Sequence, residues 1–125
     1  MNWTAVGSVL MAAGVAAGAF GAHGLRAKLD AYSMSVYEKA VFYHFVHALG
    51  ILLIAILVRT NTITSSGANR TAGLLLLGIF VFSGSLYALS VTGVRMLGAI
   101  TPIGGVAFIA GWVLLAFEAG RVQRF

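Results

Sequence analysis

Four stretches without a charged residue dominate this chain, and each is long enough to cross a lipid bilayer. No Lys, Arg, Asp or Glu occurs in residues 1–25, 40–58, 71–94 or 96–117. A helix needs about 20 apolar residues to span the hydrocarbon layer, and lipid demands that the backbone satisfy its own hydrogen bonds. The sequence therefore predicts an all-α integral membrane protein, with four transmembrane helices in a compact antiparallel bundle that forms a single domain.

The composition excludes the main soluble alternatives. Only 9% of the 125 residues are charged and 60% are hydrophobic, whereas a soluble domain carries about 25% charged residues. The basic residues flank or separate the apolar stretches, as expected where side chains meet lipid headgroups. They form no single cluster, so we expect membrane lipid as a partner and no nucleic acid. The absence of Cys excludes disulfides and thiolate chemistry.

Charged, helix-capping and loop-forming residues in the sequence predict where each span begins and ends. We expect spans over residues 3–20, 39–58, 71–90 and 101–117, with a loop between the second and third. Residues 24–38 have the pattern of a short helix lying in the headgroup plane. Ser35 and Glu38 then resemble a capping box at the start of the second span. Thr101 followed by Pro102 is the favoured order for the start of the fourth span.

Small residues within the apolar stretches predict close contacts between helices. Gly14 and Gly18 form a Gly-x-x-x-Gly pair, which lets helix backbones approach one another in lipid. Packing within the chain and contact between copies of the chain are both open for this pair. The glycines expected to pack helices together are Gly14, Gly18, Gly84, Gly104 and Gly105.

Polar side chains gather toward one face of the membrane when the four spans are threaded alternately. Intramembrane polar groups are costly and tend to face the interior of a bundle. We therefore expect a low-dielectric half and a polar half. The candidate ligand-binding residues are His23, Tyr43, His44, His47, Tyr87 and Thr101.

His44 and His47 are the most distinctive members of this group, because their spacing places them on one face of a helix. They have four interpretations: hydrogen bonds to Tyr or Ser on neighbouring helices, a bound organic head group such as a quinone, proton or ion transfer, and metal ligation. No spacing typical of a catalytic metal accompanies them, and Ser83 and Ser85 lack an acid–base partner. We therefore predict no metal site, no catalytic residues and no required cofactor.

The direction of insertion is weakly encoded. One side of the membrane would carry Arg59, Arg70, Arg121 and Arg124, and the other side would carry an equal number of basic residues. The count used by the positive-inside rule is therefore tied. We expect both termini on the same side and favour the cytoplasm.

Several motifs in collinear order resemble one known family. They are the segment Gly18–Leu25, His47-Ala48-Leu49, the segment Ser83–Tyr87 and the segment Leu97–Gly105. Together they resemble the YgdD-like family of small bacterial inner-membrane proteins, a domain of unknown function that has a mitochondrial transmembrane relative. The resemblance implies a four-helix membrane protein and places His23, His47, Tyr87, Thr101 and Pro102 in the family pattern. It implies no activity.

Three functions are consistent with these features. The first is an accessory or assembly component of a membrane complex without chemistry of its own, present as a homo-oligomer or bound to a partner in the bacterial inner membrane. The second is a binding protein for a lipid-soluble head group such as a quinone. The third is a small channel or proton path, which would need an oligomer because four spans are few to enclose a pore.

Overall fold

The computed structural model describes residues 1–122, within which every regular element is a helix. Arg124, one of the basic residues counted above, lies outside this range. The elements are α1 (Trp3–Phe20), which a π-helical turn (Gly21–Leu25) prolongs, α2 (Ala31–Arg59), α3 (Ser65–Gly78), a second π-helical turn (Ile79–Ser83), α4 (Gly84–Thr92) and α5 (Leu97–Val122). Because α3, the second π-helical turn and α4 are continuous, the described chain contains four long apolar helices, as predicted.

Short polar residues define where three of these helices begin. The side-chain oxygens of Asn2, Asp30 and Thr64 accept hydrogen bonds from backbone N–H groups in the first turns of α1, α2 and α3. Such caps satisfy donors that a helix start leaves free. Gly93 ends α4 with a φ of 72°, a left-handed conformation that glycine adopts without steric cost.

The expected interfacial helix is not a separate element. Residues 31–38 form the first turns of α2, which begins at Ala31 because the Asp30 carboxylate accepts a 2.7 Å hydrogen bond from the Ser33 N–H. The predicted capping box is also wrong, since the Ser35 hydroxyl donates to the Tyr32 carbonyl inside the helix. Asp30 and Ser35 are both residue types that can cap a helix, and Asp30, the earlier of the two, caps α2.

The third and fourth spans also begin earlier than predicted. Thr64 caps a helix that begins inside the expected loop, at Ser65. The fourth helix begins at Leu97, so Thr101 is not its N-cap and Pro102 lies within it. Three backbone bonds between residues 94 and 99 form the turn that leads into α5. Pro102 consequently falls in the second turn, where its missing N–H costs one helical hydrogen bond.

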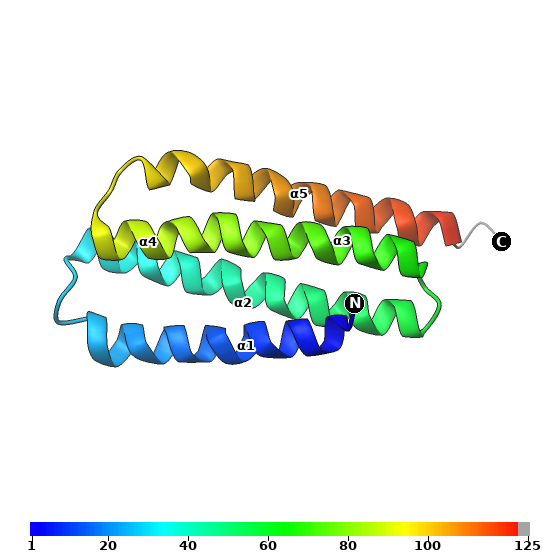
Figure 1. Cartoon of the computed structure of the whole chain (residues 1–125), viewed down its shortest axis with the longest axis horizontal. Helices are drawn as coiled ribbons and strands as arrows, with labels where there is room; N and C mark the ends of the chain where they lie inside the picture. The colour runs from blue at the N-terminus through cyan, green and yellow to red at the C-terminus, as the bar shows by residue number, and fades with distance from the viewer. Residues whose placement is uncertain (123–125) are drawn as a thin grey trace.

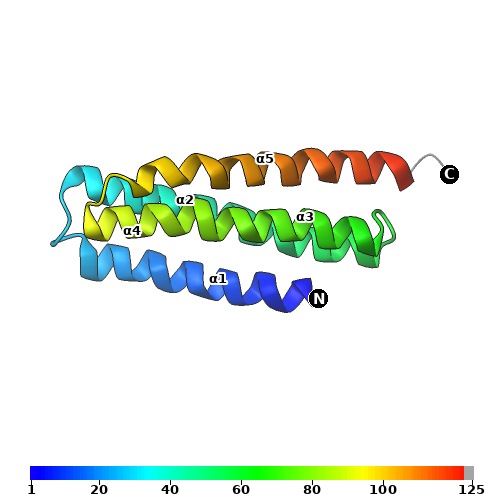
Figure 2. The ribbon, with the colours of Figure 1, turned by 45° about the horizontal axis from the view of Figure 1, so that its top comes forward.

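The four long helices are arranged in antiparallel order around a central pair. Figures 1 and 2 show α2 and the α3–α4 helix in the middle, with α1 and α5 on opposite outer sides. The N-terminus and the end of α5 lie at the same end of the bundle (Figure 1). The uncharged part of α2 from Lys39 to Arg59 rises roughly 30 Å, which equals the thickness of a hydrocarbon layer.

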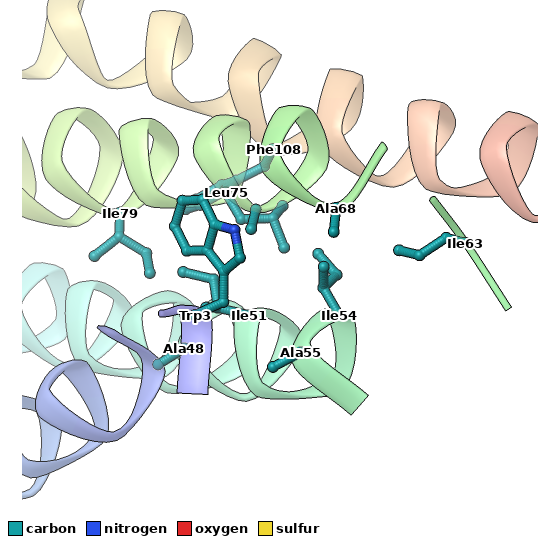
Figure 3. Packing of buried hydrophobic residues seen from close by; sticks show 11 residues of the cluster. Trp3, Ala48, Ile51, Ile54, Ala55, Ile63, Ala68, Leu75, Ile79 and Phe108 are labelled. Atoms are coloured by element: carbon teal, nitrogen blue, oxygen red, sulfur yellow. The ribbon is translucent and has the colours of Figure 1, made fainter. Parts of the chain in front are cut away.

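The main core lies where the two central helices face each other. Ile51 and Ile54 of α2 and Leu75 of α3 are each 0% exposed. Trp3 from α1 and Phe108 from α5 close this core from the outer helices (Figure 3). The Trp3 indole also donates a 2.8 Å hydrogen bond to the Asn69 side chain. Trp3 therefore joins α1 to α3.

Candidate functional site

An aromatic cavity lies between α2 and α5, over the second π-helical turn. Its volume is about 330 Å³, within the range of small-molecule sites. Gly105 and Ile109 of α5 form part of its lining, and the Ile109 side chain is 66% exposed, so the cavity reaches the lipid-facing surface. The polar and aromatic residues that line it are Tyr43, His47, Phe82, Phe108 and Trp112.

His47, which lines this cavity, uses one of its two ring nitrogens in a hydrogen bond within the described chain. Its Nδ1 lies 2.7 Å from the Tyr43 carbonyl oxygen, and because a carbonyl only accepts, Nδ1 must carry the hydrogen. In the neutral imidazole Nε2 is then an acceptor, and no residue in the described range bonds to it. No fully enclosed side-chain nitrogen or oxygen lacks a partner among residues 1–122. Nε2 is therefore not fully enclosed, and His47 is one of the residues that line the aromatic cavity.

Aromatic rings hold the His47 imidazole in position. The Phe108 ring stacks on it with centroids 3.5 Å apart and planes 12° apart. The Trp112 ring lies 5.8 Å away at 51°. The Tyr43 ring packs against Phe82 at 4.5 Å, and its hydroxyl has no bonding partner within residues 1–122. The residues that line the cavity therefore include a hydroxyl that donates or accepts and a nitrogen that accepts, together with flat apolar rings.

Two wall rings of the cavity each rest against a glycine on a facing helix, and the backbone of a third wall residue, Phe82, packs against another glycine. A Cβ added at Gly50 would meet the Trp112 ring at 2.8 Å. A Cβ at Gly78 would collide with the Phe108 ring, and one at Gly104 would collide with the Phe82 backbone. The rings can occupy their positions only because these helix surfaces lack side chains.

His44 is saturated by hydrogen bonds, in contrast to His47. Its Nε2 donates to the Leu10 carbonyl at 2.8 Å, so in the neutral ring Nδ1 accepts from the Tyr87 hydroxyl at 2.9 Å. The Tyr87 ring also packs edge-on against Tyr37 at 5.2 Å, and the Tyr37 hydroxyl donates to the Ala17 carbonyl. These bonds join α1, α2 and α4, which assigns His44 and Tyr87 to helix packing.

The remaining candidate ligand residues lie elsewhere. His23 is exposed in the first π-helical turn, at the end of α1. The Thr101 hydroxyl shares a 2.6 Å hydrogen bond with Ser85 and donates to the Leu97 carbonyl at 3.3 Å. The structure thus brings only Tyr43 and His47 of the six candidates into the aromatic cavity.

The predicted packing glycines differ in what they face. Gly14 and Gly18 both face α2. Gly14 lies opposite the Phe45 ring, and a Cβ added at Gly18 would lie 3.7 Å from the Val41 side chain. Gly104 and Gly105 face the second π-helical turn, whereas Gly84 has nothing within 4 Å of its ideal Cβ. The Gly-x-x-x-Gly pair is therefore used inside the chain, and Gly84 faces no other helix of the described chain.

Glu118 forms an ionic cluster near the end of α5, at the end of the bundle where the termini lie (Figure 1). Its side chain is 3% exposed, and its carboxylate lies 3.0 Å from the Arg70 guanidinium and 3.6 Å from that of Arg121. A Cβ at Gly67 would meet the carboxylate at 2.5 Å, so a bare backbone makes room for it. Arg121 is three residues after Glu118 on the same helix, a spacing at which side chains meet, whereas Arg70 comes from another helix and could be found only from the tertiary fold.

Within residues 1–122 no group of three or more His, Asp or Glu side chains could hold a metal ion. The aromatic walls were missed by sequence reasoning, although Phe108 and Trp112 have the spacing of one helical face. Their common position beside Gly104, Gly105 and Gly111 is a detectable signal.

Comparisons with known proteins agree with this architecture. Residues 17–105 match the model of a family described as "Protein of unknown function (DUF423)". A UPF0382 membrane protein of Staphylococcus haemolyticus is 51% identical over 88% of each chain. The UPF0382 membrane protein YwdK of Bacillus subtilis is 47% identical over 90% of this chain and 89% of its own. No solved structure matches.

These relatives confirm the predicted resemblance to a bacterial membrane family of unknown function. With four long apolar helices in the described range, the protein is a multi-pass membrane protein. The chain belongs to the DUF423 family, whose curated relatives carry the name UPF0382 membrane proteins.

Proposed function

We propose that this protein is a non-catalytic accessory protein of the bacterial inner membrane, which binds the ring of a lipid-soluble quinol in the aromatic cavity. One observation carries the proposal: His47 lines a cavity walled by aromatic rings, and its Nε2 atom is an acceptor that no residue of the described chain uses. Flat rings stack well on such walls. A bound quinol hydroxyl would donate to Nε2, and Tyr43 would serve a second oxygen.

The depth of the cavity supports a ligand that partitions into lipid. His47 lies roughly 12 Å along α2 from Lys39, inside the uncharged part of the helix. A water-soluble ligand would have to cross hydrocarbon to reach it, whereas a quinol with an isoprenoid tail is already dissolved there. Ile109, at the edge of the cavity, leaves a route for such a tail on the outer surface.

The hydrogen-bonding groups of the aromatic cavity favour binding of a quinol over binding of the oxidised quinone. A quinol carries hydroxyl hydrogens that can be donated to Nε2, whereas the oxidised quinone only accepts. Because His47 donates its single hydrogen to Tyr43, the oxidised ring would depend on the Tyr43 hydroxyl alone. We therefore expect a short-chain naphthoquinol to bind at least tenfold more tightly than the matching naphthoquinone.

Fluorescence of Trp112 provides the test, in a Trp3→Phe background that leaves one tryptophan. Titration with a short-chain naphthoquinol should quench the emission, and His47→Leu should weaken binding about tenfold, as expected for the loss of about 1.4 kcal/mol. His23→Gln is the matched control, because His23 is exposed and distant from the cavity. Equal affinities for His47→Leu and the control would overturn the proposal, as would purified protein that carries and binds no quinol.

A role in assembly is the second candidate, favoured by the open surface of the α3–α4 helix. Gly73 and Gly84 have nothing within 4 Å of their ideal Cβ positions, so another backbone could approach there. The chain contains no Cys, and a single Gly84→Cys variant therefore reports contact between copies by disulfide formation in native membranes. Gly120→Cys, at another open position, is the control. Equal cross-linking at both positions would contradict an interface at Gly84.

We also propose that both termini face the cytoplasm. Thr62→Cys lies in the connection on the side of the termini, and Val94→Cys lies in a connection on the other side. A membrane-impermeant maleimide applied to intact cells should label only the Val94→Cys variant. Labelling of Thr62→Cys instead would reverse the orientation.

A further inference from the structure

A second cavity, of about 620 Å³, lies at the end of the bundle opposite the termini. It is enclosed by the start of α2, the end of α4 and the connection into α5, all outside the aromatic cavity described above. Its volume falls within the range of small-molecule sites. The residues that line it are Asp30, Tyr32, Ser33, Val36, Leu89, Ser90, Gly93, Arg95 and Gly98.

The walls of this end cavity combine an apolar base with a charged rim. Val36 and Leu89 are 8% and 9% exposed and belong to one buried cluster. Ser90 is 3% exposed and donates its hydroxyl hydrogen to the Tyr87 carbonyl, which leaves its oxygen able to accept. Above them stand Asp30 and Arg95, both exposed. The cavity is therefore amphipathic from base to rim.

The two rim charges do not neutralise each other. Within residues 1–122 the ion pairs join Arg26 to Glu38, and Arg70 and Arg121 to Glu118. Hydrogen bonds from Ser33, chiefly from its backbone N–H, hold the pKa of the Asp30 carboxyl below its usual value. Asp30 is thus an anion at neutral pH, and the guanidinium of Arg95 is a cation. Opposite charges at one cavity, each without an ionic partner, suit a ligand that carries both signs.

The position of the end cavity along the bundle indicates where such a ligand would come from. At 1.5 Å per residue, Asp30 lies roughly 13 Å along α2 beyond Lys39, outside the uncharged part of the helix. Polar headgroups occupy the layer that borders the hydrocarbon on each side. The charged rim is therefore at headgroup depth, and the apolar base at Val36 and Leu89 is directed toward the hydrocarbon.

We propose that the end cavity binds the headgroup of a zwitterionic phospholipid with a primary amine, of the phosphatidylethanolamine type. Arg95 would hold the phosphate, since guanidinium pairs well with phosphate oxygens. Asp30 would accept hydrogen bonds from the ammonium group, and the glycerol end of the acyl chains would lie over Val36 and Leu89. This assignment does not depend on the quinol proposal, because the two cavities share no residue.

Native mass spectrometry of protein exchanged into mixed-lipid nanodiscs tests the assignment with three lipids. Phosphatidylethanolamine offers a phosphate and an amine that donates hydrogen bonds, phosphatidylcholine offers a quaternary amine that cannot donate, and phosphatidylglycerol offers no amine. The wild type should retain phosphatidylethanolamine at least fivefold more than either competitor. Soluble glycerophosphoethanolamine, added separately, distinguishes a lipid from a free headgroup.

Two variants, the first with a matched control, test whether the rim residues Arg95 and Asp30 bind the lipid headgroup. Arg95→Gln should reduce retention of all three lipids at least tenfold, whereas Arg59→Gln, an equal loss of charge at the other end of α2, should not. Asp30→Asn keeps an amide oxygen that caps the helix and removes only the charge. It should abolish the preference for phosphatidylethanolamine over phosphatidylglycerol.

Three results would overturn the assignment. The first is equal lipid retention by Arg95→Gln and Arg59→Gln. The second is a wild type that does not discriminate between phosphatidylethanolamine and phosphatidylglycerol. The third is binding of glycerophosphoethanolamine as tight as that of the lipid, which would make the ligand a soluble headgroup. Circular dichroism of each variant keeps these outcomes separate from misfolding.

Discussion

The guanidinium of Arg70 lies 3.0 Å from the nearly buried carboxylate of Glu118, and this ion pair joins the first turns of α3 to the end of α5. Arg70 is 53% exposed on its side chain, whereas Glu118 is 3% exposed. The two partners therefore differ in exposure. The Arg70 side chain can turn toward the lipid headgroups, whereas the Glu118 carboxylate cannot reach them. Arg121 supplies a second, more exposed cation at 3.6 Å.

We expect Arg70→Gln to lower the free energy of unfolding by roughly 2 kcal/mol, because it leaves a buried carboxylate with one largely exposed cation. Arg121→Gln removes a largely exposed partner and should cost less than about 1 kcal/mol. The double variant Arg70→Gln/Glu118→Gln should recover part of the loss, since it removes the stranded charge. Denaturation by SDS in mixed micelles measures all three. An equal cost for the two arginine variants would contradict this account.

Tyr87→Phe should destabilise the bundle without affecting the aromatic cavity. It removes the donor to His44 and leaves Nδ1 of that ring without a partner, at a cost of about 1 kcal/mol. His47→Gln, by comparison, breaks one bond to a carbonyl of its own helix and should cost less. Thermal unfolding in detergent ranks the two variants, and Tyr32→Phe, at an exposed position, is the control. A larger loss for His47→Gln would show that the roles of the two histidines are reversed.

Gly78→Ala should displace the Phe108 ring from the His47 imidazole, since a Cβ at residue 78 would collide with that ring. Overpacking of this kind costs about 1–3 kcal/mol. Emission from Trp112 should also shift as the cavity wall moves. Gly120→Ala, where nothing lies within 4 Å of the added carbon, should be neutral or slightly stabilising because it lowers the entropy of the unfolded chain. Identical emission and stability in both variants would count against the packing described here.

The start of α2 should loosen at acidic pH. The pKa of Asp30 is lowered in the folded protein by hydrogen bonds from Ser33, so its ionised form is the stabilising one. The stabilisation is complete above the unfolded value of about 3.9 and is lost as the pH falls through the lower folded value. Hydrogen exchange at the Ser33 amide should therefore show less protection at pH 2 than at pH 5. Asp30→Asn should remove that difference, and its persistence would assign the effect to another group.

The sequence predicts the helices well and their beginnings poorly. Uncharged stretches are sufficient to place four spans, because lipid allows few alternatives to the helix. Cap residues are short-range signals, however, and Asp30 and Ser35 are both suitable by type. The burial of Val36 in one cluster with Leu89 favours the longer α2. Pro102 inside α5 is tolerated for the same reason, since tertiary contacts extend the helix back to Leu97.

The candidate site could be predicted only in part. Spacing places His44 and His47 on one face, but it cannot show that one imidazole is saturated and the other open. That difference depends on Leu10 and Tyr87, which come from other helices. The link between Trp3 and Asn69 is likewise a tertiary contact between residues far apart in the sequence.

The glycines behind the rings of the aromatic cavity affect the conformational entropy that ligand binding would cost. Because Gly50 and Gly78 let the backbone of a neighbouring helix pack directly behind the Trp112 and Phe108 rings, these two rings have little room to rotate. A molecule that enters would meet surfaces already set in place and would pay little conformational entropy to order them.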